Sequence, residues 1–141
     1  MDIPRRVYNL INKYGTADPY LLARDLNIHV DTYLLPDNIR GCCTYLLRRR
    51  FIGISEKLSE KSQKAVLCHE IGHLRLHGLG TFSCTLSKSR IFYRKEYEAN
   101  IFALHMLSYS SMFDLDIAQK YLKDKRPEPD IVHRILSEIM D

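Results

Sequence analysis

Two histidines lie four residues apart in a segment with helical spacing of apolar residues: Ala65-Val66-Leu67-Cys68-His69-Glu70-Ile71-Gly72-His73. Residues four apart on a helix lie only about 40° apart around its axis, because each residue turns the chain by about 100°. The imidazoles of His69 and His73 can therefore reach one ion at the ~2.0–2.1 Å length of a zinc–nitrogen bond. This spacing makes the two histidines candidate metal ligands.

Glu70 is a candidate catalytic residue beside these two histidines. It projects about 100° away from His69, so it is badly placed to join the same coordination sphere. It can instead accept a proton from a water molecule that a metal ion has made acidic. Gly72 lowers helix stability by about 1 kcal/mol relative to Ala, which indicates that another element packs closely there. The alternative, an exposed helix with two unrelated histidines, is disfavoured because apolar residues flank the motif on two sides.

A catalytic zinc site needs a third protein ligand. The segment after the motif offers four candidates with nitrogen or carboxylate donors: His77, Glu96, Glu98 and His105. On a predicted helix over residues 92–108, Glu96 shares a face with apolar residues, whereas Glu98 falls on the most polar side. We therefore expect Glu96 to be the third ligand, with Asn100 behind it as a hydrogen-bonding partner. The alternative is a surface carboxylate at Glu96 that pairs with Asn100 or Arg94.

The rest of the sequence predicts a single domain over residues 1–141 with an α+β fold. Apolar spacing and capping signals predict helices over 4–14, 19–26, 59–77, 92–108, 115–122 and 131–139. Strands are predicted over 28–34, 43–47 and 51–54, the last two forming a hairpin that turns at Arg48-Arg49-Arg50. Residues 78–91 are rich in Gly, Ser and Thr and are predicted to be a loop. We expect the small sheet to pack against the motif helix and the second ligand-bearing helix, followed by a helical C-terminal part.

Composition and charge restrict the class of protein. Hydrophobic residues make up 45% and charged residues 27% of the chain, a globular balance that excludes general disorder. The formal net charge of +4 is too small to indicate direct binding of nucleic acid. We expect no secretory signal, and no apolar run approaches the ~20 residues that span a membrane. Since Cys42, Cys43, Cys68 and Cys84 lack C-x-x-C spacing, we expect a reduced, cytoplasmic chain.

Four segments of the chain resemble the ImmA/IrrE family of metallopeptidases: Leu22–Val30, Phe51–Ser55, Gln63–His73 and Glu96–Ala103. The combination of H-E-x-x-H with E-x-x-x-N-x-x-A some twenty residues later is more specific than H-E-x-x-H alone. The resemblance implies that His69, His73 and Glu96 bind Zn²⁺ and that Glu70 is the general base. The chain departs from the family pattern at His105-Met106-Leu107-Ser108-Tyr109, where a Leu-Leu-Met-Pro-like stop is usual.

The resemblance also implies a protein substrate, a helix-turn-helix repressor of a prophage, another mobile element or a stress regulon. One rival hypothesis is a catalytically silent, zinc-containing module that controls a repressor by binding alone. A second is a DNA-binding protein, because Leu21–Ile28 is similar to the first helix of a helix-turn-helix. The residues that follow are predicted to form a strand, so the recognition helix is missing. The oligomeric state stays open, as does the oxyanion donor, for which four residues are candidates: His77, Tyr93, Tyr97 and Tyr109.

Overall fold

A computed structural model describes residues 1–78, 82–86, 94–110, 123 and 127–140. The described part contains four strands and five helices in this order: α1 (Ile3–Tyr14), α2 (Pro19–Asp25), β1 (Ile28–Tyr33), β2 (Ile39–Leu46), β3 (Arg49–Ser55), α3 (Glu60–His77), β4 (Phe82–Leu86), α4 (Arg94–Ser108) and α6 (Pro129–Met140). The α+β class is confirmed. The predicted helix over residues 115–122 lies outside the described residues.

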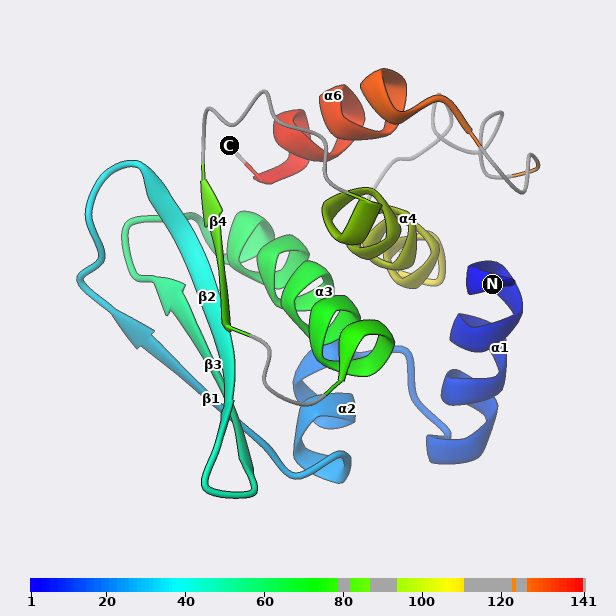
Figure 1. Cartoon of the computed structure of the whole chain (residues 1–141), viewed down its shortest axis with the longest axis horizontal. Coiled ribbons are helices and arrows are strands. Elements are labelled where there is room, and N and C mark those ends of the chain that lie inside the picture. The colour runs from blue at the N-terminus through cyan, green and yellow to red at the C-terminus, as the bar shows by residue number, and fades with distance from the viewer. Residues whose placement is uncertain (79–81, 87–93, 111–122, 124–126, 141) are drawn as a thin grey trace.

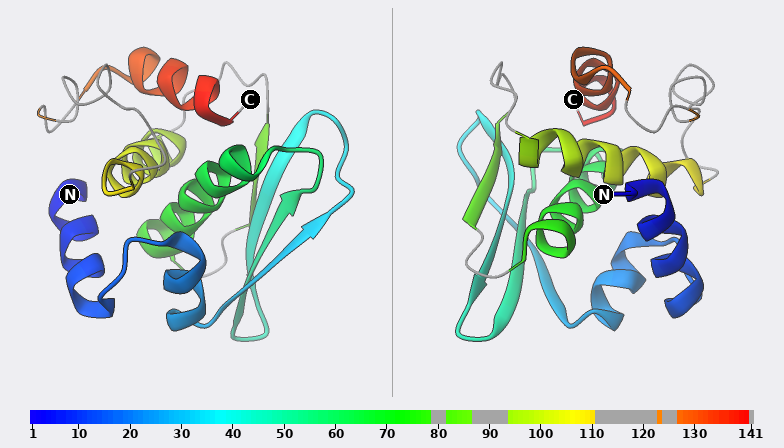
Figure 2. Two further views of the ribbon diagram at one scale, coloured as in Figure 1. Left: turned by 180° about the vertical axis from the view of Figure 1, so that it is seen from behind. Right: turned by 45° about the vertical axis from the view of Figure 1, so that its right-hand side comes forward.

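The four strands form one mixed sheet in the order β1-β3-β2-β4. β1 runs parallel to β3, whereas β2 is antiparallel to both of its neighbours, β3 and β4. One face of the sheet covers α3 and buries Cys43, Ile52 and Ile54 against it. None of the described helices lies on the other face, where Tyr33 and Phe51 are exposed (Figure 2). The sheet is therefore packed on one side only.

Helix α3 occupies the centre of the molecule, between the sheet and α4 (Figure 1). All residues from Ala65 to Leu74 are buried, because the sheet, α2, α4 and α6 all contact this helix. Cys68, which directly precedes the motif, is only 1% exposed. The segment that carries the H-E-x-x-H motif is therefore the core of the fold as well as its candidate site.

Local signals set the ends of the helices as predicted. Asp18 begins α2 by accepting a hydrogen bond from the Tyr20 backbone N–H at 2.9 Å. Ser59 begins α3 in the same way, with the Ser62 N–H at 3.2 Å. Gly78 ends α3 with a positive φ of 69°, a backbone conformation that is unfavourable for residues with a side chain. After α2 the chain enters β1 and so provides no recognition helix where a helix-turn-helix needs one.

The predicted turn of the β2–β3 hairpin is wrong by one residue. Leu47 and Arg48 form a two-residue turn, and the rest of the Arg48-Arg49-Arg50 run lies in β3. Both turn residues have positive φ, 51° and 64°, as the preferred twist of a two-residue hairpin requires. The usual Asn-Gly signal for this turn is missing from the sequence, so the turn carried no local signature.

The predicted loop over residues 78–91 is also wrong in part, because residues 82–86 form β4. β4 pairs with β2 in a register that places Cys84 opposite Cys42. These two cysteines are joined by a disulfide, with their Cα atoms 4.1 Å apart. The expectation of a fully reduced chain is therefore wrong at this pair. Cys43 and Cys68 are buried thiols, and burial raises the pKa of Cys68 to about 12.

No described helix is long and apolar enough to cross a bilayer.

Helix α4 packs closely against α3 at Gly72, as the helix-propensity cost of this glycine predicted. A Cβ atom on Gly72 would lie 3.0–3.1 Å from three side-chain atoms of Phe102. We expect Gly72→Ala to lower the free energy of unfolding by about 1 kcal/mol: overpacking costs about 1–3 kcal/mol and the helix-propensity gain offsets about 1 kcal/mol. Urea unfolding of the variant measures this change.

Substitution of Phe102 tests whether overpacking causes the loss of stability in Gly72→Ala. If overpacking is the cause, Phe102→Leu should relieve it, so the double variant should be more stable than the sum of the two single changes predicts. Additive effects in this double-mutant cycle would show that the contact between Gly72 and Phe102 does not set the spacing of α3 and α4.

Candidate metal centre

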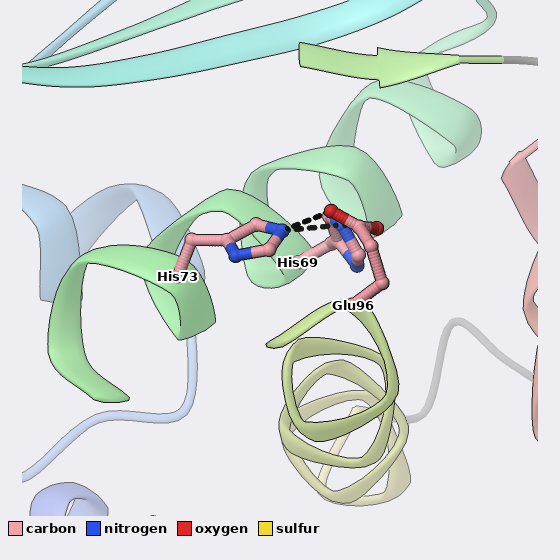
Figure 3. Close-up of side chains that lie close together, drawn as sticks. All are labelled: His69, His73 and Glu96. Carbon is pink, nitrogen blue, oxygen red and sulfur yellow. Dashed lines mark hydrogen bonds and ion pairs between the residues drawn. The ribbon is translucent and has the colours of Figure 1, made fainter. Parts of the chain in front are cut away.

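Two buried histidines on α3 form the first half of the site. His69 and His73 are one helical turn apart and are 0% and 2% exposed. Their Nε2 atoms point toward each other at 3.1 Å (Figure 3). The rings meet edge to face, with centroids 4.7 Å apart. Helical spacing thus brings two nitrogen donors to one point, as the sequence predicted.

Glu96, in the first turn of α4, completes the group from the opposite helix (Figure 3). Its Oε1 lies 2.8 Å from His73 Nε2, and its Oε2 lies 3.2 Å from His69 Nε2. The Glu96 side chain is 30% exposed, in contrast to the two histidines. The site is therefore closed on the side of α3 and reaches solvent beside Glu96.

The three side chains have the chemistry and the spacing of a metal site. One donor atom from each lies within 4.8 Å of the others. In a tetrahedral zinc site with bonds of ~2.0–2.1 Å, donor atoms are about 3.3 Å apart, close to the separations found here. Two nitrogens and one carboxylate oxygen also leave a fourth position open, as catalytic zinc sites require. The residues present therefore fit a bound zinc ion.

The electrostatics of the group also favour a cation. Burial lowers the pKa of His69, but hydrogen bonding to Glu96 and the charge of Glu70 outweigh it, so the net shift is upward. Burial raises the pKa of Glu96, but contact with both histidines outweighs it and holds that pKa far below its usual range. An ionised carboxylate beside two imidazoles in a buried site is an arrangement that attracts positive charge.

Comparisons with known proteins identify the family of this chain. The family model of the IrrE N-terminal-like domain, Peptidase_M78, matches residues 23–134. The chain belongs to this family. It is also 35% identical over 108 residues to "Uncharacterized immunity region protein 2" of Bacillus phage phi105. The aligned region covers 74% of this chain and 67% of the relative. No solved structure is significantly similar. The resemblance inferred from the sequence is confirmed.

In this Peptidase_M78 domain, Glu70 lies on the side of α3 that faces the sheet. It is 0% exposed, and strand β2 passes close to it at Gly41. A Cβ atom on Gly41 would lie 2.6 Å from Val66 Cγ1 and 3.6 Å from Glu70 Oε1. Only glycine lets the strand approach the helix this closely. Sequence reasoning missed Gly41, because the close approach appears only once β2 is placed against α3.

The Peptidase_M78 helix α4 presents Asn100 and Glu98 as well as Glu96. Asn100 is 5% exposed and is one of the groups that raise the pKa of His69, in agreement with its predicted place behind the site. Glu98 is 8% exposed, whereas the sequence placed it on a polar face. Its charge is compensated by Arg94, whose Nε lies 3.2 Å from Glu98 Oε1. Pairing thus allows a carboxylate to be buried where helical projection predicts exposure.

The described residues leave the oxyanion donor unassigned. The Tyr97 hydroxyl donates a hydrogen bond to the Pro127 carbonyl. Tyr109 follows the last turn of α4, about 20 Å along the axis from Glu96 at 1.5 Å per residue. Tyr93 lies outside the described residues. His77 faces the Nδ1 side of His73 rather than the Nε2 side where the three donors meet.

Proposed function

We propose that the chain is a zinc-dependent endopeptidase, with Zn²⁺ held by His69, His73 and Glu96 and with residues 1–141 acting as one domain. The observation that carries the proposal is the convergence of two histidine Nε2 atoms and one carboxylate within 4.8 Å on two packed helices. Membership of the Peptidase_M78 family supports the same activity. Direct binding of nucleic acid is not part of the proposal.

Glu70 is the proposed general base. Zinc bound at this site would lower the pKa of a water molecule and polarise the scissile carbonyl. Glu70 adjoins His69 in the chain; it would accept the proton of the attacking water and later deliver it to the leaving amine. Its complete burial against β2 keeps the carboxylate in one place and excludes bulk water from its sheet side. His73 leaves its Nδ1 for a contact with the Nδ1 of His77, at 3.3 Å.

The proposed substrate is a helix-turn-helix repressor in the cytoplasm, where the repressor meets its DNA. Two observations support it: the family match, and the similarity to a protein named for a phage immunity region. The alternative is a zinc-containing module that controls the repressor by association without cutting it. The position of Glu70, next to the proposed ligand His69 in the chain, favours the enzyme, because a carboxylate there has the chemistry of a general base.

The decisive experiment is incubation of the chain with a candidate helix-turn-helix repressor, chosen from the neighbouring reading frames, with and without a zinc chelator. We expect two repressor fragments that disappear when the metal is removed and return when Zn²⁺ is restored. Mass spectrometry of the fragments identifies the cleaved bond. Intact repressor in a stable complex with the chain would instead support the binding module, and fragments that persist in chelator would contradict the zinc mechanism.

A further inference from the structure

His77 lies in the last turn of α3, directly behind a candidate ligand. It follows His73 by four residues, so the two rings share one face of the helix, with centroids 5.4 Å apart. The His77 side chain is 5% exposed. Its Nδ1 lies 3.3 Å from the Nδ1 of His73. The sequence contained this signal, since the motif continues as H-E-x-x-H-x-x-x-H.

The chemistry of a metal-ligating imidazole determines the direction of this contact. A neutral histidine that offers Nε2 to a cation carries its hydrogen on Nδ1. His73 would therefore donate from Nδ1, and the Nδ1 of His77 would accept. The remaining hydrogen of His77 is then on Nε2, which points toward Glu98 Oε1 at 3.9 Å. That distance exceeds a hydrogen bond but allows attraction between the N–H group and the carboxylate.

Glu98 connects this contact to the other ligand helix. Its side chain is 11% exposed and forms an ion pair with Arg94, one turn earlier on α4. The Arg94 side chain is 85% exposed. Glu98 is also two residues after Glu96, so one short segment of α4 contacts the site at two places. Glu96 approaches the Nε2 atoms of the two motif histidines, and Glu98 approaches the ring behind His73.

We propose that His77 is a positioning residue for the metal site: it accepts a hydrogen bond from His73 and links that ring, through Glu98, to the helix that carries Glu96. The proposal rests on the zinc site proposed above. Outer partners of this kind fix the orientation and tautomer of a histidine ligand before the metal arrives. This role also accounts for a buried histidine that faces away from the reacting groups.

The test compares the zinc affinity of His77→Phe with that of the unchanged chain, by competition with a chromogenic chelator. Phenylalanine keeps a flat ring but cannot accept the hydrogen bond, so we expect affinity to fall about 10–100-fold. His77→Gln, which restores an acceptor oxygen, should recover most of it. The matched control is His29→Phe, a histidine on the exposed face of β1, which should change affinity less than about threefold.

Cobalt substitution gives a readout that a purely structural role would not move. In His77→Phe the visible absorption bands of bound Co²⁺ should shift, because the His73 ring loses its fixed orientation. Should His77→Phe not fold, Glu98→Ala tests the same link from α4, with an expected loss of about tenfold in zinc affinity. Unchanged affinity and an unchanged Co²⁺ spectrum in whichever variant folds would overturn the proposal.

Glu96→Ala separates failure of this inference from failure of the zinc site. If Glu96→Ala binds zinc as tightly as the unchanged chain, the zinc site itself is wrong. If Glu96→Ala loses zinc while His77→Phe and Glu98→Ala keep full affinity, only the positioning role of His77 is wrong.

Discussion

Replacing Glu70 by glutamine is expected to abolish repressor cleavage while the chain keeps its zinc. The substitution preserves the size of a side chain that is fully buried between α3 and β2, so the packing at Gly41 should be unchanged. It removes the carboxylate that accepts the proton. General acid–base catalysis contributes about 10²–10⁴-fold to a rate, and we expect kcat to fall by at least that range. Fragment yield over time measures it.

Zinc content is the companion measurement for Glu70→Gln. Because Glu70 is not one of the three convergent donors, zinc stoichiometry and affinity should stay close to those of the unchanged chain. Glu60→Gln, at the exposed start of α3, is the matched control and should cleave normally. Cleavage by Glu70→Gln at the original rate would remove Glu70 from the mechanism.

The second large effect is expected from Glu96→Ala, which should lose both zinc and cleavage. Glu96 is the only contribution of α4 to the convergent group found among the described residues. Loss of an outer partner of a ligand already costs about 10–100-fold in affinity, so loss of the ligand itself should cost more than 100-fold. Metal analysis after dialysis, together with chelator competition, measures the loss.

Substitution of two other acidic residues tests whether the loss of zinc is specific to Glu96. Glu138→Ala, on the exposed side of α6, should keep full zinc affinity and full cleavage. Glu98→Ala should lose less affinity than Glu96→Ala, since Glu98 approaches His77 and not the two Nε2 atoms. If Glu98→Ala lost zinc and Glu96→Ala did not, the assignment of the third ligand would have to be reversed.

The parts of the fold that could be predicted from the sequence are those that depend on local signals. Asp18 and Ser59 mark helix starts, and the i, i+4 spacing of His69 and His73 places both on one face. Projection around the later helix also picked out Glu96, because its apolar neighbours indicated an inward face. Each of these inferences needs only residues within a few turns of the same segment.

The parts that sequence could not predict depend on contacts between distant segments. β4 is a strand because β2 lies beside it, and the opposition of Cys42 and Cys84 follows from that register. Glu98 is buried because Arg94 compensates its charge and the His77 ring lies beside it, contacts that a projection of average polarity does not detect. Gly41 matters only because β2 crosses α3 at Glu70.

The two close approaches to α3, by β2 at Gly41 and by α4 at Gly72, bear on which ion the protein can select. With a strand and a helix in contact on either side, the motif helix has little freedom to move its donors apart. Donor separations of 2.8–3.2 Å suit a small ion with short bonds. Calcium takes six to eight oxygen ligands at about 2.3–2.6 Å, a larger, all-oxygen shell than two imidazole nitrogens and one carboxylate provide. We therefore expect backbone packing to act together with the donor chemistry in favouring zinc at this site.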